Sequence, residues 1–307
     1  MKILISGVNG FVGSSLLGKI PAEYTIVGQG RGIEKTKSNL KKFFDIDINS
    51  QSIWAPCLHG VEVVVHLAAV AHNNSDNIDY MYEVNVNGTI NLVQQAIQSG
   101  VKRFIFISSI GVLGNGTKPG KAFDELSPVV PHSQYAQSKL DAENALLKIA
   151  KESKMEVVII RPVLVYGASA PGNFGKLVNL VNKVPMLPFA LCNNKRSFIS
   201  VSNLVDFILV CITHPKAANE VFCISDGIDI SIRELTDGIA KGLNKNLVQL
   251  PIPVFIFKLV GKIAGKSELI EQLIGDLQVD STKARILLDW EPPVTMVETF
   301  SKLTINN

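Results

Sequence analysis

The sequence predicts an α/β protein with a parallel central sheet that is covered by helices on both faces. Short apolar runs alternate with segments of helical length, and the first run leads directly into glycines at every third position. Parallel strands that are buried on both faces need continuous apolar runs, and each return to the sheet needs a crossover helix. We therefore expect a Rossmann-like doubly wound sheet and a smaller mixed α/β cap in the C-terminal part.

The first expected strand, residues 2–6, is followed by Gly7, Gly10 and Gly13. Gly7 would let the chain turn sharply off the strand, Gly10 would let the backbone approach a pyrophosphate, and Gly13 would let the next helix pack on the sheet. The helix expected over 11–20 presents free N–H groups and a dipole that favour negative charge at its N-terminus. This stretch predicts a dinucleotide-binding site.

Further expected elements alternate along the chain. We expect strands over 24–28, 43–46, 61–67, 103–109 and 156–161, and helices over 85–100 and 131–153. Prolines break the remainder into short elements, which predicts a lid assembled partly from insertions. We expect residues 1–165 to form the dinucleotide domain, part of 195–225 to return to it, and 166–307 to form mainly the cap.

The residues after the second expected strand bear on the choice of cofactor. A carboxylate there would bind the ribose 2′-hydroxyl of NAD, whereas an arginine accommodates the 2′-phosphate of NADP. The chain reads Gln29, Gly30, Arg31, with no acid before Glu34. We therefore predict NADP(H) as the favoured cofactor and NAD(H) as the alternative.

Three polar side chains form the expected catalytic group. Ser109 ends the strand expected over 103–109, at the sheet edge where doubly wound proteins bind ligands. Tyr135 and Lys139 lie four residues apart, and therefore on one face of the next helix. Beside a nicotinamide they would supply a proton donor or acceptor, a cation that lowers the phenol pKa, and a hydroxyl that fixes the substrate oxygen.

With these motifs the chain resembles the extended short-chain dehydrogenase/reductases, the NAD-dependent epimerase/dehydratase family, in the branch of nucleotide-sugar 4-ketoreductases and 4-epimerases. The acidic pair that dehydratases carry beside the serine is absent, because Ile110 and Gly111 follow Ser109, and this argues against a dehydratase. The resemblance is carried by GVNGFVG at 7–13, DI at 45–46, HLAA at 66–69, NVNGT at 85–89, SSIGVLG at 108–114, YAQSK at 135–139, RPVLVYG at 161–167 and RSFISVSNLVD at 196–206.

The resemblance implies roles for the matched residues. Tyr135 would be the catalytic acid/base, Lys139 would hold the nicotinamide ribose and lower the pKa of Tyr135, and Ser109 would bind the reacting sugar oxygen. Arg196 would grip the substrate diphosphate, as a charged fork can. The cofactor would lie on Gly7, Asn9, Gly10, Phe11, Val12, Gly13, Arg31, Asp45, Ile46, Leu67, Ala68, Ala69, Ser108, Tyr135, Lys139 and Pro162, and the substrate on Ser109, Asn173, Pro188, Phe189 and Arg196.

The segments at 161–167, 194–206 and 277–285 resemble the enzymes that reduce the C4 keto group of UDP-4-keto-6-deoxy-N-acetylhexosamines for surface polysaccharides. Such a 4-ketoreductase is the first function that we predict. The alternative is a 4-epimerase of UDP-hexoses, UDP-N-acetylhexosamines or a lipid-linked sugar diphosphate. A non-catalytic NAD(P)-binding regulator is a third hypothesis, which the retention of Ser109, Tyr135 and Lys139 opposes.

Composition limits the partners and the location. The net charge of +3 is too small and too dispersed for nucleic-acid binding, and the 4 cysteines form no CxxC pair that would indicate a metal site or disulfides. We expect a cytoplasmic protein without a signal peptide. The apolar stretch 251–265 is too short to span a membrane and contains Lys258 and Lys262, so it predicts an amphipathic helix or a peripheral membrane contact. The resemblance implies a homodimer formed by the helices at 85–100 and 131–153.

Overall fold

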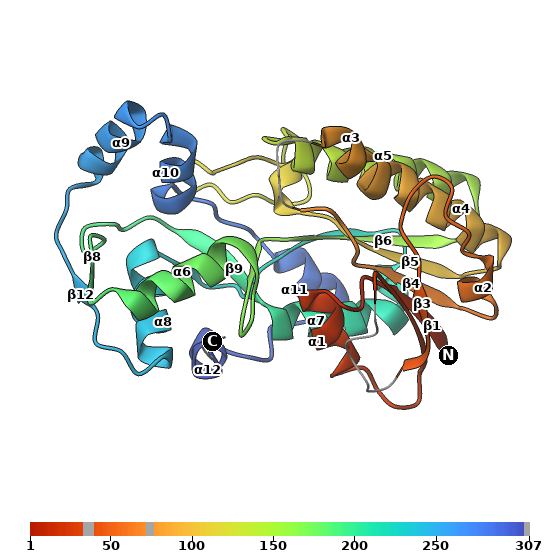
Figure 1. Ribbon diagram of the computed structural model, residues 1–307. Helices are drawn as coiled ribbons and strands as arrows, with labels where there is room; N and C mark the ends of the chain where they lie inside the picture. Colours follow the sequence, from red (N-terminus) through yellow and green to blue (C-terminus); the bar gives the residue numbers. More distant parts are fainter. Residues whose placement is uncertain (33–39, 72–76, 304–307) are drawn as a thin grey trace.

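A seven-stranded parallel sheet lies between two layers of helices in the computed structural model, which describes residues 1–32, 40–71 and 77–303 (Figure 1). The strand order is β10-β6-β5-β4-β1-β2-β3. The chain builds β2 and β3 on one side of β1, and then crosses to build β4, β5 and β6 on the other, so the strand order reverses between β1 and β4. Ligands of doubly wound sheets bind at this point, outside the carboxyl ends of the strands. The strands are β1 Lys2–Ser6, β2 Thr25–Gly30, β3 Leu40–Asp45, β4 Val63–His66, β5 Arg103–Ile107, β6 Glu156–Pro162 and β10 Val221–Ile224.

Each face of the sheet is covered by its own helices and has its own apolar core (Figure 1). The apolar runs predicted as strands fall on β1 to β6 in order. The side chains of β1, β2, β4, β5 and β6 are nearly all buried, as the absence of polar alternation requires, whereas those of the edge strand β3 are partly or fully exposed. One layer contains α1 Phe11–Leu17, α7 Val201–Thr213 and α11 Thr282–Leu288, and the other contains α2 Ala55–Leu58, α4 Thr89–Gln98 and α5 Gln134–Glu152. The predicted Rossmann-like fold is therefore confirmed.

The glycine turn after β1 forms as predicted. Gly7 has φ +74°, and its carbonyl accepts a hydrogen bond of 2.9 Å from the Gly10 amide. A Cβ atom built on Gly13 would lie 2.3 Å from the Gly7 oxygen, so only glycine lets α1 begin this close to the turn.

The helix expected to begin at residue 85 begins earlier, and that prediction is wrong. It starts with α3 Ile78–Tyr82, where the Asn77 side chain caps the helix by accepting the Tyr80 amide at 2.9 Å. The chain then continues through η1, a π-helical segment at Glu83–Gly88, into α4. Gly88, which lies within this continuous helical stretch, makes a close contact, because a Cβ there would lie 2.5 Å from Ile48 Cγ2.

The cap is built on two small sheets and a set of helices at one end of the main sheet (Figure 1). Its core is aromatic: the Tyr166 ring packs against the rings of Phe174, Phe198 and Phe300. The cap elements are β7 Leu164–Tyr166, β8 Met186–Leu187, β9 Arg196–Ser200, β11 Asp229–Ile230, β12 Val248–Gln249, α6 Gly172–Lys183, α8 Ile232–Gly242, α9 Val254–Ile263, α10 Ser267–Ile274 and α12 Met296–Phe300, and short turns η2 Ile110–Val112 and η3 Pro215–Ala217 lie nearer the main sheet. The division at residue 165 stays a prediction; after β9, the chain returns through α7 to β10 in the main sheet.

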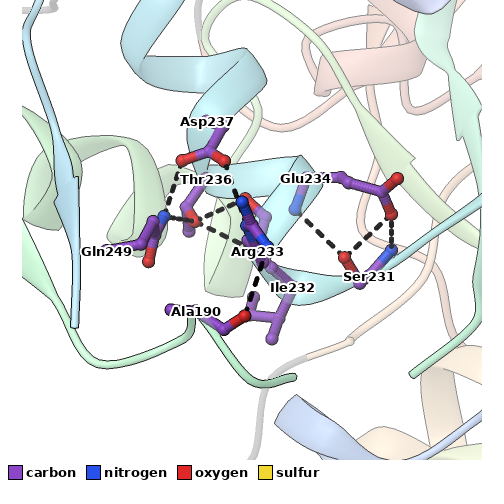
Figure 2. Close-up of polar contacts among 8 residues, drawn as sticks. All are labelled: Ala190, Ser231, Ile232, Arg233, Glu234, Thr236, Asp237 and Gln249. Atoms are coloured by element: carbon purple, nitrogen blue, oxygen red, sulfur yellow. Dashed lines mark hydrogen bonds and ion pairs between the residues drawn. The ribbon is translucent and has the colours of Figure 1, made fainter. Parts of the chain in front are cut away.

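Helix α8 anchors the loop that follows β8. Figure 2 shows the capping box at its start, in which Ser231 and Glu234 each satisfy the other's backbone amide. From the first turn, Arg233 Nη1 donates to the Ala190 carbonyl at 3.3 Å. Gln249 of β12 reaches α8 from the other side, as Figure 2 also shows. The loop 188–192 is also tied to the segment after β12, because the Ala190 amide donates to the Leu250 carbonyl at 3.2 Å.

The close approach of α1 to the glycine turn can be tested by Gly13→Ala. The added Cβ would meet two backbone atoms, Gly7 O at 2.3 Å and Val8 Cα at 2.8 Å, which cannot rotate away. We expect the free energy of unfolding, measured by urea titration, to fall by about 3 kcal/mol. Gly18→Ala is the matched control, because Gly18 has φ −73° and its nearest atoms lie 3.6 Å away, and it should change stability by less than about 0.5 kcal/mol. Equal losses would contradict this packing.

Candidate active site

Lys139 is held deep in the sheet edge by groups from β5. Its side chain is 2% exposed, and Nζ donates to the Ile107 carbonyl at 2.7 Å while it lies 4.4 Å from the centre of the Phe106 ring. Burial lowers the pKa of Lys139 to about 7, and the nearby Glu143 carboxylate opposes that shift. The ammonium has three donors and the Ile107 carbonyl takes one, so this group can still bind a ligand.

Tyr135 lies one helical turn before Lys139, at the start of α5. Helix α5 begins at Gln134 because the Ser133 side chain caps it, accepting the Ala136 amide at 3.1 Å. Burial raises the pKa of the Tyr135 phenol to about 12. The phenol therefore needs a neighbouring cation before it can lose a proton near neutral pH.

Ser109 follows β5 and is brought against the same helix by η2. Its Oγ accepts the Gly111 amide at 3.1 Å, so the side chain caps this short turn. A Cβ on Gly111 would lie 3.3 Å from Ser109 Oγ and 3.5 Å from Ala136 Cβ, next to Tyr135 in the chain. The structure thus brings Ser109 and the start of α5 to the same carboxyl edge of the sheet.

The glycine turn and the end of β5 fit a dinucleotide. Helix α1 begins at Gly10 with no side-chain cap, and so leaves its first N–H groups for a phosphate. Among the described residues, no donor or acceptor bonds the Oγ of Ser108, which is 3% exposed. A buried hydroxyl without a partner is unfavourable, and a ligand that reaches it would remove that penalty. The other positions predicted for the cofactor lie at the carboxyl ends of their strands: Asn9, Phe11 and Val12 after β1, Ile46 after β3, Leu67, Ala68 and Ala69 after β4, and Pro162 at the end of β6.

Arg31 lies just beyond β2, exposed, at the place expected for the adenosine ribose. Its Nη1 donates to the Tyr80 hydroxyl at 2.9 Å, and its carbonyl accepts from Asn9 Nδ2 at 3.2 Å. The Asp45 carboxylate accepts the Gly32 amide at 3.0 Å in the same turn. The structure therefore places a cation and a carboxylate together, and the preference for NADP(H) stays a prediction.

Gln29 is a residue whose role the sequence did not indicate. Its Oε1 accepts the Gly7 amide at 3.2 Å and its Nε2 donates to the Ile46 carbonyl. This side chain ties the glycine turn to the end of β3. No sequence signal pointed to this role, because Gln29 lies just beyond the strand expected over 24–28, whereas β2 extends to Gly30.

His66 is at the centre of a hydrogen-bond chain whose direction can be assigned. The Thr89 hydroxyl donates to the Asn85 carbonyl at 2.8 Å, so its oxygen must accept the proton on His66 Nε2 at 2.9 Å. His66 Nδ1 is then the acceptor, at 2.6 Å from the Ser6 hydroxyl. The neutral ring is therefore fixed in one tautomer.

The chain continues from both ends of His66. The Ser6 oxygen accepts the amides of Leu67 and Ala68 at 3.2 and 3.3 Å, which are predicted cofactor contacts. At the other end the Asn85 side chain donates to the Ser138 hydroxyl at 3.0 Å, and Ser138 donates to the Tyr135 carbonyl at 2.8 Å. The edge predicted to bind the cofactor and helix α5 are thus connected by one network.

Arg196 is held at the cap side of the site. It lies in β9, and its Nη1 donates to the Gly275 carbonyl at 3.1 Å, just after α10. Burial lowers the pKa of Arg196 to about 10, and Asp276 opposes that shift. Of the other predicted substrate residues, Asn173 is exposed in the first turn of α6. Phe189, which follows Pro188, is buried, and the centre of its ring lies 5.8 Å from that of Phe257, on which it stacks. Their roles in substrate binding stay predictions.

Comparison with known proteins decides the family. The model of the NAD dependent epimerase/dehydratase family matches residues 3–225. The chain belongs to this family. A UDP-glucose 4-epimerase of Vibrio cholerae is 44% identical over 98% of this chain and 94% of its own length. An N-acetyl-alpha-D-glucosaminyl-diphospho-ditrans,octacis-undecaprenol 4-epimerase of Escherichia coli O157:H7 is 30% identical over 92% of this chain and 88% of its own.

Solved structures agree with the family at the level of the fold. The UDP-glucuronic acid 4-epimerase of Bacillus cereus, in complex with NAD, superimposes with a TM-score of 0.79 at 21% identity, over 99% of this chain and 95% of that chain. The family match confirms the predicted resemblance to the NAD-dependent epimerase/dehydratase family, and the solved structures confirm its fold. By its family match, the chain is an enzyme of the epimerase/dehydratase type.

The buried His66 predicts a specific pH dependence of stability. Burial lowers its pKa to about 3, from the usual 6.5. Between these values the unfolded chain binds a proton that the native protein does not, so the free energy of unfolding should fall by about 1.4 kcal/mol for each pH unit below 6.5. We expect the free energy of unfolding, measured by urea titration, to fall between pH 7.5 and pH 5.0 by about 2 kcal/mol more in the parent protein than in His66→Gln. Parallel losses in both proteins would contradict a buried neutral imidazole.

Proposed function

We propose that the protein is a UDP-hexose 4-epimerase that works with NAD. The observation that carries the proposal is the 44% identity to the Vibrio cholerae UDP-glucose 4-epimerase, which extends over nearly the whole of both chains. The site supports it, because Ser109, Tyr135 and Lys139 lie at one edge of the sheet beside the glycine turn. The 4-ketoreductase activity that the sequence predicts first stays a prediction, as do the cytoplasmic location and the homodimer.

The residues of the chain account for the proton transfer. A nicotinamide bound at this edge supplies the hydride acceptor, and the protein must remove the proton of the sugar 4-hydroxyl. Tyr135 takes that proton as a phenolate, and the Lys139 ammonium one turn away favours the phenolate. Ser109 hydrogen-bonds the same oxygen. In the return step Tyr135 gives the proton back to the oxygen at C4.

Lys139 must stay charged for this mechanism, and Glu143 supports the cation against the burial that lowers the pKa of Lys139 to about 7. Glu143 lies one turn further along α5 and is 1% exposed. Arg161 of β6 holds that carboxylate with both nitrogens of its fork, Nε at 3.0 Å and Nη2 at 2.6 Å. The pair fixes a buried negative charge beside the ammonium and opposes the loss of its proton.

Inversion at C4 also requires that the sugar present both faces to the same hydride donor. The sugar must turn while the rest of the substrate stays bound. Arg196, which the resemblance assigns to the diphosphate, is held on the cap by the Gly275 carbonyl. We propose that Arg196 keeps the diphosphate in place while the ring turns.

Tyr135→Phe tests the proposed acid/base. We expect turnover of UDP-glucose to UDP-galactose to fall about a thousand-fold, while the affinity for NAD in a fluorescence titration stays within a factor of about two. Tyr24→Phe is the matched control, because Tyr24 lies before β2 at the opposite edge of the sheet. Turnover that survives the loss of the Tyr135 hydroxyl would exclude this mechanism.

The substrate and the cofactor are tested together by following product formation by chromatography. UDP-glucose and UDP-N-acetylglucosamine are supplied with NAD or with NADP and no reductant, and we expect C4 epimers with NAD. A UDP-4-keto-6-deoxy-N-acetylhexosamine with NADH or NADPH is the second arm. Stoichiometric oxidation of NADH or NADPH by the 4-keto sugar, without epimerisation of UDP-glucose or UDP-N-acetylglucosamine, would establish the 4-ketoreductase instead. Cofactor binding without turnover in any arm would indicate a non-catalytic regulator.

A further inference from the structure

Helices α9 and α10 form a hairpin at the end of the cap, away from the main sheet (Figure 1). Its inner contacts are apolar and close. Gly261 of α9 lies against Ile270 of α10, since a Cβ there would be 2.7 Å from Ile270 Cγ1. Phe257 of α9 stacks on Phe189 of the cap core at 5.8 Å. These contacts account for one face of α9 only.

The opposite face of α9 is apolar and exposed. Phe255, Leu259 and Ile263 are four residues apart, so they form one stripe along the helix, and they are 67%, 54% and 79% exposed. Val260 extends the stripe sideways, and Leu269 of α10 is exposed beyond the turn. In a water-soluble helix this face would be polar, so its composition needs a reason.

Lysines border this stripe on one side. At 100° per residue, Lys258 and Lys262 lie on the flank of α9 that adjoins Phe255, and α9 contains no acidic residue. Lys266 follows in the turn. Lys258 is paired with Glu271 of α10 at 3.2 Å, but both side chains are more than half exposed, so the pair is weak and the lysine can reorient. An apolar stripe with a lysine border is the pattern of helices that lie in a membrane interface.

We propose that α9 and the turn into α10 form a peripheral membrane-binding surface for a bilayer with anionic headgroups. Phe255, Leu259 and Ile263 would enter the boundary between headgroups and acyl chains, while Lys258 and Lys262 reach up to the headgroup phosphates. No helix in the described parts of the chain is long and apolar enough to cross a bilayer.

A second copy of the chain fits this stripe less well. The helix has 10 residues and is therefore about 15 Å long, so its exposed face offers at most a few hundred Å². A stable protein interface needs about 800 Å² from each partner. The lysine border also repels an identical border, whereas it complements anionic lipid.

Membrane contact at this hairpin would set the orientation of the active site. Helix α10 ends at Ile274, and the next residue, Gly275, holds Arg196. The bilayer would therefore lie beside the end of the site assigned to the diphosphate. This orientation rests on the proposed function, whereas the membrane-binding surface does not.

The surface is tested by co-sedimentation of the full chain with lipid vesicles. We expect the protein to bind vesicles of phosphatidylcholine with about 30% phosphatidylglycerol, and to bind pure phosphatidylcholine several-fold more weakly. Phe255→Ser combined with Ile263→Ser should weaken binding at least ten-fold, and Lys258→Gln with Lys262→Gln should remove the preference for anionic vesicles.

A matched control removes equally exposed apolar side chains elsewhere. Ile286 of α11 and Val297 of α12 are 77% and 68% exposed, close to Ile263 and Phe255, and their joint replacement by serine should leave vesicle binding unchanged. Equal thermal midpoints would show that all variants fold. The proposal is overturned if the parent protein binds neither vesicle, if both serine pairs weaken binding equally, or if the first pair dissociates an oligomer in analytical ultracentrifugation, which would identify a second copy as the occupant.

Discussion

The burial of the Lys139 ammonium is the constraint on which the site depends. A cation taken out of water is unfavourable unless the protein replaces its solvation. The Ile107 carbonyl, the Phe106 ring and the Glu143 carboxylate do so, and two of these belong to β5. Helix α5 can therefore occupy one position on the sheet, and that position brings Tyr135 to the end of β5.

Helix α5 is also connected to the edge predicted to bind the cofactor. The connection is made by buried polar side chains that hydrogen-bond one another, which a purely apolar core would not contain. The neutral His66 ring joins β1 to Thr89, the first residue of α4. Thr89 donates to the Asn85 carbonyl in η1, and the Asn85 side chain extends this connection to Ser138 on α5. Because the Thr89 hydroxyl donates to the Asn85 carbonyl, the hydrogen bonds on both sides of the His66 ring have an assigned direction. A site that needs atoms placed within fractions of an ångström gains this precision from packed helices and strands, and the loops only complete it.

Features that depend on residues close together in the sequence could be predicted, and features that depend on distant residues could not. The roles of Gly7 and Gly13 could be predicted, because the sharp turn and the close approach of the helix involve residues only six apart in the sequence. Tyr135 and Lys139 could be read because helical geometry fixes which residues share a face. The start of the long helix at Ile78 was missed, because the NVNGT motif at 85–89 indicated the helix start and the Asn77 cap was not recognised.

Interactions between distant parts of the chain were beyond the sequence. Ser6 and His66 are 60 residues apart, and Arg196 and Gly275 are 79 apart, so no local pattern joins them. The exposure of α9 was likewise undecided, because an apolar stripe looks the same whether a core or a membrane covers it. For Phe189 the structure gives a packing partner, Phe257, that the resemblance did not imply.

We propose that this edge of the sheet inverts a sugar at C4 by removing and returning the same hydrogen. The sharpest test uses UDP-glucose that carries deuterium at C4, in ordinary water with the protein and NAD. We expect the UDP-galactose formed to keep its deuterium at C4, as mass spectrometry and NMR would show. Loss of the deuterium to solvent, or product only when an external reductant is consumed in equal amount, would contradict it.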